Sequence, residues 1–340
     1  MFQCKAKVIA DSISAITGKR MTTFEIEFPR IILAEFNTHK ALNRNASSSR
    51  AIPVNTMLDQ VRNNPAMPVR FGAANKGMQD AGEHDGLVSI GKYQYSPEKA
   101  WGIAAIQASR IAEAFHEAGY AKQVCNRLIE PFQMMKVVCS ATDWANFFWL
   151  RDHEAADPTI EQLAKVMRKA MDESTPVVLQ PGEWHVPYYN DGYWKFAGSV
   201  SVVDTHLEGE DPTWKTVDID KFGHTLEHAL TISSSCCAQV SYRKLDDTLE
   251  KAKGVVARLN LQGEEPENPV HASPLEHQAT PMEPNNIKNV NGEIVETNGG
   301  RPCTWQKGVT HMTRDLEFCS GNLNGFIQHR QLVPNHVKRG

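Results

Sequence analysis

The densest group of side chains that could do chemistry lies between Thr38 and Arg50. Three consecutive hydroxyls, Ser47 to Ser49, end there at the guanidinium of Arg50. Hydroxyls and the amides of a turn donate hydrogen bonds to phosphate oxygens, and an arginine adds a bidentate charge-assisted pair. The segment therefore indicates a phosphate-binding loop. A Ser-rich surface loop before Pro53 is the alternative, and composition alone favours it.

The elements on either side must hold this loop in place. Residues Thr22 to Phe36 carry β-formers around Pro29 and are expected to be extended. The polar stretch Asn37 to Arg50 that follows is expected to be a turn region, which ends at Ile52 and Pro53.

Further along the chain, helix and strand signals alternate. Ser96 before Pro97 is a helix start, and apolar residues recur at helical spacing from Trp101 until Gly119. Asp157 before Pro158 starts another helix, whose inward residues would be Ile160, Leu163, Met167 and Ala170. The remaining expected elements are a helix from Lys122 to Glu130, a strand from Met134 to Cys139, a helix from Thr142 through Arg151, strands and loops from Val177 to Val203, helix from Lys221 to Ser234, and a hairpin turn at Val290–Glu293.

Composition bounds the class of protein. The chain has 340 residues, 41% apolar and 22% charged, which is an ordinary globular balance. We expect one catalytic domain over residues 1–340, with insertions near 177–215 and 280–302. The net charge of −4 argues against binding of a long nucleic acid, and no apolar run is long enough to span a membrane. Seven cysteines without a C-x-x-C pair are expected to be reduced thiols of a cytoplasmic protein.

The loop between Thr38 and Arg50 resembles the signature of flavin-dependent thymidylate synthases, R-H-R-x-x-S-x-N-x-x-S-x-R-Y. Four of its positions match, at His39, Asn45, Ser48 and Arg50. The sequence departs from the signature at four others, where Thr38 and Lys40 replace the leading arginines, Asn43 replaces a serine and Ala51 replaces the tyrosine.

Three further segments are similar to the same family. Residues Asn146 to Arg151 resemble its N-F-L-x-L-R stretch, at the end of a helix. Residues Ala238 to Tyr242 and Ala272 to His277 resemble two stretches that precede the signature in the family but follow it here. The order indicates a circularly permuted relative, which is physically reasonable where chain ends lie close together on one compact unit.

The resemblance implies roles for individual residues. It implies that Ser48, Ser49 and Arg50 hold a nucleotide phosphate, with Arg127 as a second cation. Arg151 would face the uracil ring and stabilise negative charge on its carbonyl, and its alternative is a helix-end arginine paired with Asp152 or with the helix dipole. The residues implied to line the flavin are His39, Lys40, Asn45, Asn146, Ser241, Ser273 and Glu276, with Arg330 as a cation that could replace the one missing at Thr38.

By the same resemblance the fold is α+β, with helices packed on a mainly antiparallel sheet, and the protein is a homotetramer with sites shared between subunits. The implied reaction is reductive methylation of dUMP to dTMP, in which methylenetetrahydrofolate gives the carbon, FAD the hydride and NADPH restores the flavin. No cysteine nucleophile is needed. Two alternatives stay open: a flavin- or folate-dependent enzyme that makes another pyrimidine product, such as a hydroxymethylated one, and a nucleotide-binding relative without catalysis.

Three other features allow a structural or a functional interpretation. Trp184 and His185 follow a Pro-Gly turn and could form a lid or stack on folate, although a structural turn is favoured. His224 and His228 lie four residues apart, but no third metal ligand follows at a suitable spacing, so we expect a polar helix face and no metal. The adjacent Cys236 and Cys237 are expected to be a buried pair.

Overall fold

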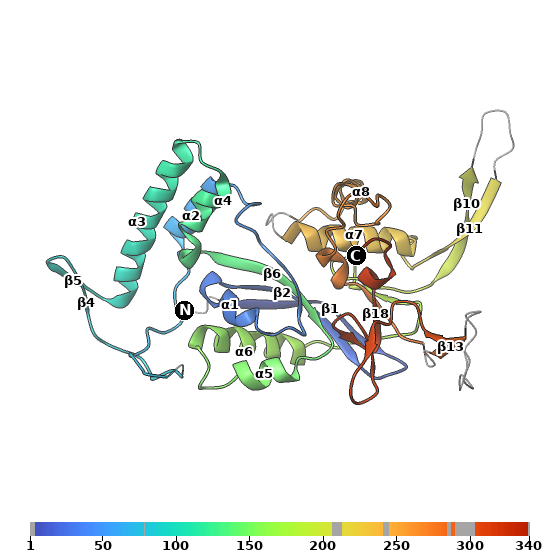
Figure 1. Ribbon diagram of the computed structural model, residues 1–340, viewed down its shortest axis with the longest axis horizontal. Coiled ribbons are helices and arrows are strands. Elements are labelled where there is room, and N and C mark those ends of the chain that lie inside the picture. Colours follow the sequence, from blue (N-terminus) through green and yellow to red (C-terminus); the bar gives the residue numbers. More distant parts are fainter. Residues whose placement is uncertain are drawn as a thin grey trace.

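The computed structural model describes residues 4–77, 79–205, 213–240, 245–283, 287–289 and 303–338. It has the expected α+β architecture, with helices packed on a mainly antiparallel sheet (Figure 1). The central sheet has the strand order β3-β6-β2-β1-β7. Three of its pairings are antiparallel, and β7 pairs parallel with β1. Its strands are β1 (Lys5–Ser14), β2 (Arg20–Pro29), β3 (Asn43–Ala46), β6 (Met134–Ala141) and β7 (Val177–Leu179).

Helices α5 (Ala145–Arg151) and α6 (Pro158–Asp172) cover one face of this sheet (Figure 1). The start of α6 is confirmed, because the Asp157 carboxylate accepts hydrogen bonds from the backbone N–H groups of Thr159 and Ile160 at 2.8 and 3.3 Å. Ile160, Leu163 and Met167 are fully buried, as their spacing predicts.

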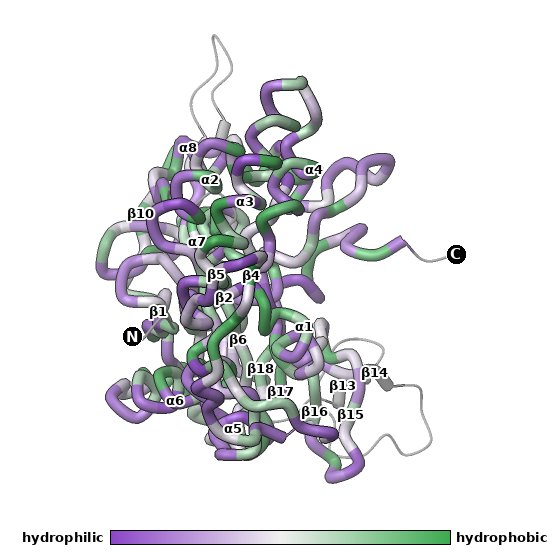
Figure 2. The backbone as a smooth tube through the Cα atoms, turned by 90° about the vertical axis from the view of Figure 1, so that its left-hand side faces the viewer, coloured by the Kyte–Doolittle hydropathy of each residue, from purple (hydrophilic) through white to green (hydrophobic). Residues whose placement is uncertain are grey.

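Helices α7 (Leu226–Gln239) and α8 (Leu249–Arg258), with the 3-10 turn η4 (Ser273–Glu276), lie on the opposite face. Side chains of β6 point alternately to the two faces of the sheet, so consecutive residues belong to the two different cores. Its Cys139 packs toward α5 and α6, whereas its Val138 packs against Cys237 of α7. Figure 2 shows hydrophobic stretches along interior strands such as β6, whereas the outer loops are largely hydrophilic.

A third core joins α2 (Val54–Asn63), α3 (Pro97–Glu117) and α4 (Lys122–Arg127). The predicted start of α3 is confirmed, since the Ser96 hydroxyl accepts a hydrogen bond from the backbone N–H of Lys99 at 3.4 Å. The apolar stripe of α3 is only partly buried: Ala105 is inaccessible, but Ile111 is 53% exposed and Phe115 36% exposed.

The remaining elements are small sheets and short turns. The hairpin of β10 and β11 projects from the body, and it overlaps the end of the region near 177–215 that was expected to be an insertion (Figure 1). The other strands and turns are β4 (Val88–Ile90), β5 (Tyr93–Tyr95), β8 (Trp184–His185), β9 (Tyr193–Trp194), β10 (Gly198–Thr205), β11 (Thr213–Ile219), β12 (Ala279–Pro281), β13 (Ile287–Asn289), β14 (Cys303–Trp305), β15 (His311–Met312), β16 (Phe318–Ser320), β17 (Leu323–Asn324), β18 (Phe326–Gln328), η1 (Arg30–Ile32), η2 (Glu130–Phe132) and η5 (His329–Leu332).

Several boundaries differ from the sequence-based expectation. The extended stretch ends at Pro29, because η1 and the short helix α1 (Leu33–Phe36) follow it. The expected turn region contains strand β3, and α7 begins at Leu226 rather than at Lys221. Strand β3 forms because it pairs with β6. Helix α7 begins at Leu226 because the Thr225 hydroxyl caps it, accepting a hydrogen bond from the backbone N–H of His228 at 3.3 Å. The expected hairpin turn at Val290–Glu293 lies outside the described residues, although β13 and β14 on either side of it pair antiparallel.

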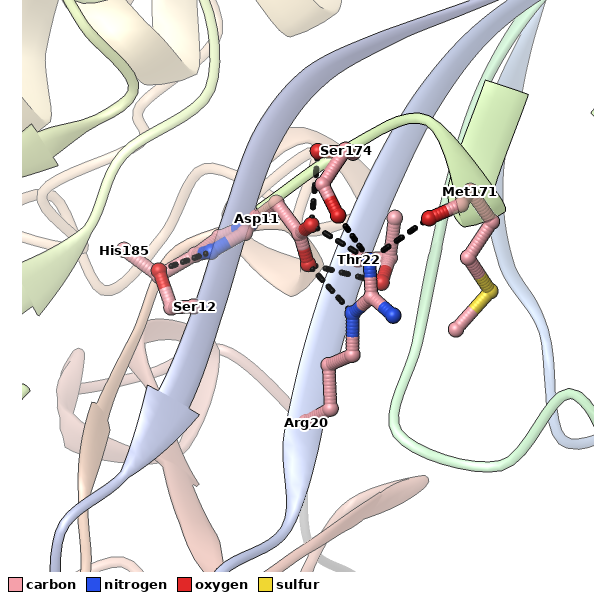
Figure 3. A network of polar contacts seen from close by, with 7 residues as sticks. All are labelled: Asp11, Ser12, Arg20, Thr22, Met171, Ser174 and His185. Carbon is pink, nitrogen blue, oxygen red and sulfur yellow. Dashed lines mark hydrogen bonds and ion pairs between the residues drawn. The ribbon is translucent and has the colours of Figure 1, made fainter. Parts of the chain in front are cut away.

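A buried polar network fixes β1 and β2 to the end of α6 (Figure 3). The Asp11 carboxylate accepts two hydrogen bonds from the Arg20 guanidinium, at 2.9 and 2.6 Å, and others from the hydroxyls of Thr22 and Ser174. Arg20 also donates to the carbonyl of Met171 at 2.8 Å. A buried carboxylate with this many donors is well compensated, so the network holds the sheet and α6 in register. Among the described residues, no helix has the length and apolar character that crossing a bilayer requires.

Candidate functional site

A groove of about 480 Å³ lies where the loop after β3 meets α7, α8 and η4. Three of the four sequence segments that resemble the flavin-dependent family contribute to it. We call it the Arg50 groove, and its lining residues are Asn45, Ser48, Arg50, Ala51, Ala238, Gln239, Val255, Arg258, Leu259, His271, Ser273 and Pro274.

Asn45 connects the segments that form the groove. It lies on β3 opposite Val138, on the face that packs against α7. Its side-chain amide donates to the carbonyl of Cys237 at 3.4 Å; with the amide turned over, its nitrogen instead donates to the hydroxyl and carbonyl oxygens of Ser273 at 3.1 and 3.2 Å. In either orientation the amide joins β3 to an element from the second half of the chain.

The loop from Ser48 to Arg50 forms a turn at the rim of the groove. The Ser48 hydroxyl accepts a hydrogen bond from the backbone N–H of Arg50 at 3.2 Å. The backbone carbonyl of Ser48 accepts one from the N–H of Ala51 at 2.9 Å. The Ser48 hydroxyl can still donate. The turn expected at this position is therefore present.

Two exposed arginines give the groove its charge. Arg50 comes from the loop and Arg258 from the last turn of α8, and His271 lines the groove beside them. Neither guanidinium has a hydrogen bond or ion pair with another described residue, and no described carboxylate contributes to the lining. Unpaired guanidinium groups beside hydroxyl donors suit a phosphate. Arg258 was not predicted, because a basic residue in the last turn of a helix is ordinarily explained by the helix dipole.

Ser49 lies outside the groove lining. It is 8% exposed and its hydroxyl donates to the Glu130 carboxylate at 2.5 Å, which also pairs with Arg30 at 2.9 Å. The carbonyl of Ser49 accepts a hydrogen bond from Asn126 at 2.9 Å. These contacts tie the loop to α4 and η2, so the geometry gives Ser49 a supporting position rather than the expected place at a phosphate.

Arg127 also lies outside the Arg50 groove. It lines a separate hollow with Arg30, Asn37 and Glu130. Within one chain, the two cations expected to share a phosphate are therefore in different pockets.

Arg151 contacts the beginning of the signature segment. Its Nε donates to Nε2 of His39 at 2.9 Å, and its Nη2 donates to the Thr38 hydroxyl at 3.3 Å. Burial, Arg151 and Arg44 lower the pKa of His39 to about 4, so its imidazole is neutral and can accept this bond. The alternative pairing of Arg151 with Asp152 is wrong, because Asp152 pairs with Arg168 at 2.6 Å.

Glu276 and Arg330 form an ion pair with each other. Burial raises the pKa of Glu276 and the Arg330 guanidinium opposes that shift. Arg330 was expected to replace the cation missing at Thr38. The structure instead places Arg151 beside Thr38, and Arg330 contacts Glu276.

The other expected flavin residues are at the periphery. The side chains of Lys40 and Asn146 are exposed, and the carbonyl of Lys40 accepts a hydrogen bond from Asn322 at 3.0 Å. Ser241 lies outside the described residues.

Trp184 and His185 are core residues, at 6% and 0% exposure, so the lid interpretation is wrong and the structural one holds. His185 joins a chain of buried hydrogen bonds: its Nδ1 pairs with Ser12 at 2.9 Å and its Nε2 with Thr23 at 2.8 Å. Thr23 pairs with Ser140 at 2.6 Å, and Ser140 with Nδ1 of His277 at 2.8 Å. The chain fixes β1, β2 and β6 to β8 and to the segment after η4.

The remaining candidates have structural surroundings. His224 precedes α7 and its Nδ1 lies 3.0 Å from the Tyr189 hydroxyl, and its ring packs edge-on against His228 at 6.1 Å. Within the described part of the chain, no group of three or more His, Cys, Asp or Glu side chains is arranged to hold a metal ion. Cys236 and Cys237 are both fully buried, as expected, and burial raises the pKa of each thiol, which suppresses the nucleophilic thiolate.

The donor set of the Arg50 groove fits a nucleotide phosphate or the diphosphate of a flavin dinucleotide. Two guanidinium groups, two serine hydroxyls and the Asn45 amide line one open groove. The other residues expected to line the flavin fit it only in part. Glu276 is already paired with Arg330, and His39 already accepts a hydrogen bond from Arg151.

No protein-family model and no curated protein matches the chain. Solved structures with some likeness include the UMP/dUMP methylase PolB from Streptomyces cacaoi bound with 5-Br dUMP, at 13% identity over 51% of this chain and 91% of that chain, with a TM-score of 0.35. The same enzyme bound with 5-Br UMP gives 12% identity, 51% and 90% coverage and a TM-score of 0.37. Flavin-dependent thymidylate synthase ThyX from Helicobacter pylori, complexed with FAD and dUMP, gives 18% identity, 44% and 67% coverage and a TM-score of 0.29.

Proposed function

We propose that this chain is a flavin-dependent enzyme that modifies a pyrimidine nucleotide, with dUMP as substrate. The observation that carries the proposal is the convergence of three segments, far apart in sequence, on the Arg50 groove. Each resembles a different stretch of the flavin-dependent thymidylate synthases. Their resemblance concerns sequence, and their meeting at one basic groove is an independent property of the fold.

In this proposal the Arg50 groove binds a phosphate group. Arg50 and Arg258 supply positive charge, and Ser48 and Ser273 supply hydroxyl donors. Ser49 holds the loop against Glu130 so that its neighbours keep their positions. Asn45 holds β3 against the second half of the chain.

Arg151 is the proposed electrostatic group for the pyrimidine. Its Nη1 makes no hydrogen bond to a described residue, while Nε and Nη2 are held by His39 and Thr38. A guanidinium fixed at two of its nitrogens can present the third to a carbonyl oxygen with little reorganisation. The neutral imidazole of His39 positions Arg151 without adding charge.

The finer proposal is reductive methylation of dUMP to dTMP, with methylenetetrahydrofolate and NADPH as co-substrates. When bound, FAD would supply the redox chemistry, and the residues proposed to hold it are His39, Lys40, Asn45, Asn146, Ser241, Ser273, Glu276 and Arg330. For the last pair, binding would require Glu276 or Arg330 to exchange its present ion-pair partner.

We further propose that the protein is a homo-oligomer. Ile111 and Phe115 of α3 and Tyr120, Val124 and Leu128 around α4 are apolar and 36–56% exposed. The rings of Phe115 and Tyr120 lie 5.0 Å apart, and exposed apolar side chains grouped on neighbouring helices favour a protein–protein contact. Arg127 lies on the same helix as Val124, so burial of this surface against another copy could bring Arg127 to a site from which it is separate within one chain.

The test begins with purified full-length protein. A yellow preparation that releases FAD on denaturation supports a flavoenzyme, and a colourless protein that gains no flavin on incubation with FAD overturns the flavin part. Mass spectrometry of the product from dUMP, methylenetetrahydrofolate and NADPH then separates the reactions. A mass increase of one CH2 unit, from a methyl group in place of a hydrogen, supports methylation, and a hydroxymethyl product points to the alternative. Tight dUMP binding without any product identifies a nucleotide-binding protein.

A further inference from the structure

The hairpin of β10 and β11 stands apart from the rest of the molecule. Its two strands form a sheet of their own, which projects from the body (Figure 1). A two-stranded hairpin is only marginally stable by itself in water, and a third strand or packing on its apolar face stabilises it. The hairpin therefore has a physical reason to take up a further strand.

One face of the hairpin is mainly apolar. Residues directly opposite each other on antiparallel strands point to the same face, so the register places Val200 with Val217 and Val202 with Lys215 on this face. Val200 is 40% exposed. Lys215 pairs with Asp204 of the same hairpin at 2.7 Å.

The other face is polar near the base of the hairpin. Apolar side chains are found on it only toward the far end, where Val203 is opposite Trp214. The pairs closer to the body are Ser201 with Thr216 and Ser199 with Asp218. A strand added to this sheet would thus meet apolar side chains on one face and polar side chains on the other.

A groove of about 560 Å³ lies between β11 and the start of α7, and we call it the Asp218 groove. Val217 and Asp218 both line it, although their side chains point to opposite faces of the hairpin. The edge of β11 therefore borders the groove. The full lining consists of Pro181, Gly182, Glu183, Trp194, Phe196, Lys215, Val217, Asp218, Thr225, Leu226 and Glu227.

The backbone of β11 is available along this edge. Among the described strands, only β10 pairs with β11. The alternate N–H and C=O groups of β11 that do not face β10 can therefore bind another extended chain. Beside this edge, the aromatic side chain of Phe196 is 58% exposed and offers an apolar contact.

The charge of the groove selects a basic partner. Three carboxylates line it against a single lysine, which Asp204 already engages. Glu183 pairs with Lys195 at 3.4 Å, whereas neither Asp218 nor Glu227 has an ion pair with a described residue. Unpaired carboxylates attract a cationic side chain and repel an anionic one.

We propose that the Asp218 groove binds an extended segment of another protein, in which apolar residues alternate with lysine or arginine, as a third strand along β11. The apolar residues of this segment lie on the same face as Val217, and the basic residues lie on the same face as Asp218. The period of two in a strand matches this division. The site does not depend on the function proposed for the Arg50 groove.

The test uses the full-length protein and the peptide acetyl-Val-Lys-Val-Arg-Val-Lys-Val-amide. We expect saturable binding in calorimetry with a dissociation constant below about 1 mM. Binding should weaken as salt is raised from about 0.05 to 0.5 M, because salt screens exposed charges. The peptide with glutamate at each basic position should bind at least about tenfold more weakly, because it brings carboxylates to carboxylates.

Backbone methylation distinguishes strand addition from simple charge attraction. Only alternate residues of a strand exchange hydrogen bonds with one given neighbour. One peptide N-methylated at its inner valines and one N-methylated at its basic residues should therefore differ: one should lose binding, and the other should keep it. Equal behaviour of the two peptides would contradict pairing along β11.

Variants locate the binding. Val217→Lys should abolish it, whereas Ser201→Lys, on the polar face of β10 and outside the groove, should not. Asp218→Asn and Glu227→Gln should each weaken it by about two- to fivefold, the range of exposed ion pairs. Glu250→Gln is the matched control, because Glu250 is exposed in the first turn of α8 as Glu227 is in that of α7, but does not line the groove.

Hydrogen exchange of the unaltered protein keeps the proposal testable if a variant fails to fold. The peptide should slow exchange of the β11 amides and leave the separate hairpin of β4 and β5 unchanged. The proposal is overturned if the basic peptide shows no saturable binding, if the glutamate peptide binds as tightly, or if β11 is not protected. A dimer of the protein alone that Val217→Lys dissociates would also overturn it, because a second copy would then occupy the groove. Binding of dUMP should be the same with and without the peptide, which separates this test from that of the Arg50 groove.

Discussion

Replacement of Arg258 by alanine is the sharpest test of the Arg50 groove. Sequence resemblance does not point to Arg258, and only the fold brings it to the same groove as Arg50. If the groove holds the phosphate of dUMP, removing either guanidinium should weaken binding. If the family resemblance alone were relevant, Arg50→Ala would have an effect and Arg258→Ala would have none.

The size of the effect follows from exposure. A hydrogen bond to a charged group contributes about 1.5 to 3 kcal/mol when it is well shielded. Arg50 and Arg258 are both exposed, so solvent and salt screen them and the lower end of that range applies. We expect each single substitution to weaken dUMP binding by about 1 to 2 kcal/mol, or roughly five- to thirtyfold. The loss should shrink as salt is raised from about 0.05 to 0.5 M, because the Debye length falls.

Isothermal titration calorimetry of dUMP and of deoxyuridine distinguishes a phosphate contact from a general one. Deoxyuridine lacks the phosphate, so its affinity should be the same in Arg258→Ala and in the unaltered protein. Lys253→Ala is a suitable control, since Lys253 is an exposed cation of the same helix that does not line the groove. Unchanged dUMP affinity in a folded Arg258→Ala variant would refute the assignment of the groove to phosphate, and an equal loss in Lys253→Ala would reduce it to long-range attraction.

Three other outcomes follow from the structure. Arg151→Lys should lower turnover on the order of a hundredfold with little change in dUMP affinity or in flavin reduction by NADPH, because lysine keeps the charge but loses the fork held by His39; equal slowing of both half-reactions in stopped-flow would contradict this. His185 and His277, whose pKa values burial lowers to about 3, remain neutral in the folded protein below pH 6.5 while the unfolded chain takes up protons there. Stability should therefore fall with pH from about 6.5 toward 3, by about 2 kcal/mol per histidine at pH 5, and urea unfolding that gives equal stability at pH 7 and 5 would contradict it. Alkylating reagents should leave turnover largely intact under native conditions, since thiols such as Cys237 are buried with raised pKa; a folded Cys237→Ser variant without activity would point to a covalent mechanism.

Local signals in the sequence predict the elements whose ends are chemically marked. Asp157 before Pro158 and Ser96 before Pro97 both cap helices, because a side-chain acceptor satisfies free N–H groups within the next three residues. The same sequence gives no comparable signal for β3, where pairing with β6 makes a strand out of a stretch rich in turn-forming residues. Pairing with a distant strand determines the structure of β3, and the residues of β3 themselves carry no signal of that pairing.

In the candidate site, too, some positions follow from local sequence and others from tertiary contacts. The signature positions Asn45, Ser48 and Arg50 line the same groove, since they come from one short segment. Arg258 joins them only because α8 packs against α7, a contact that depends on the burial of residues such as Ala252 far from the signature. Ser49 does not line the groove, because its hydroxyl donates to Glu130, and no sequence spacing predicts that partner.

The geometry of β3 explains why the expected site residues fall into two groups. Consecutive residues of a strand point to opposite faces, so Arg44 faces the α5 side with Cys139 while Asn45 faces α7 with Val138. Arg44 holds the carbonyl of His39 at 2.8 Å, and His39 in turn holds Arg151, whereas Asn45 belongs to the groove. Because β3 is the edge strand of the central sheet, the two groups lie on opposite faces of that sheet with one strand between them. Within one chain, a ligand that contacts both groups must therefore pass around this edge, which requires an elongated ligand. Otherwise a second copy of the chain must complete the site, which requires an oligomer. The function proposed for this protein includes both an elongated ligand and an oligomer.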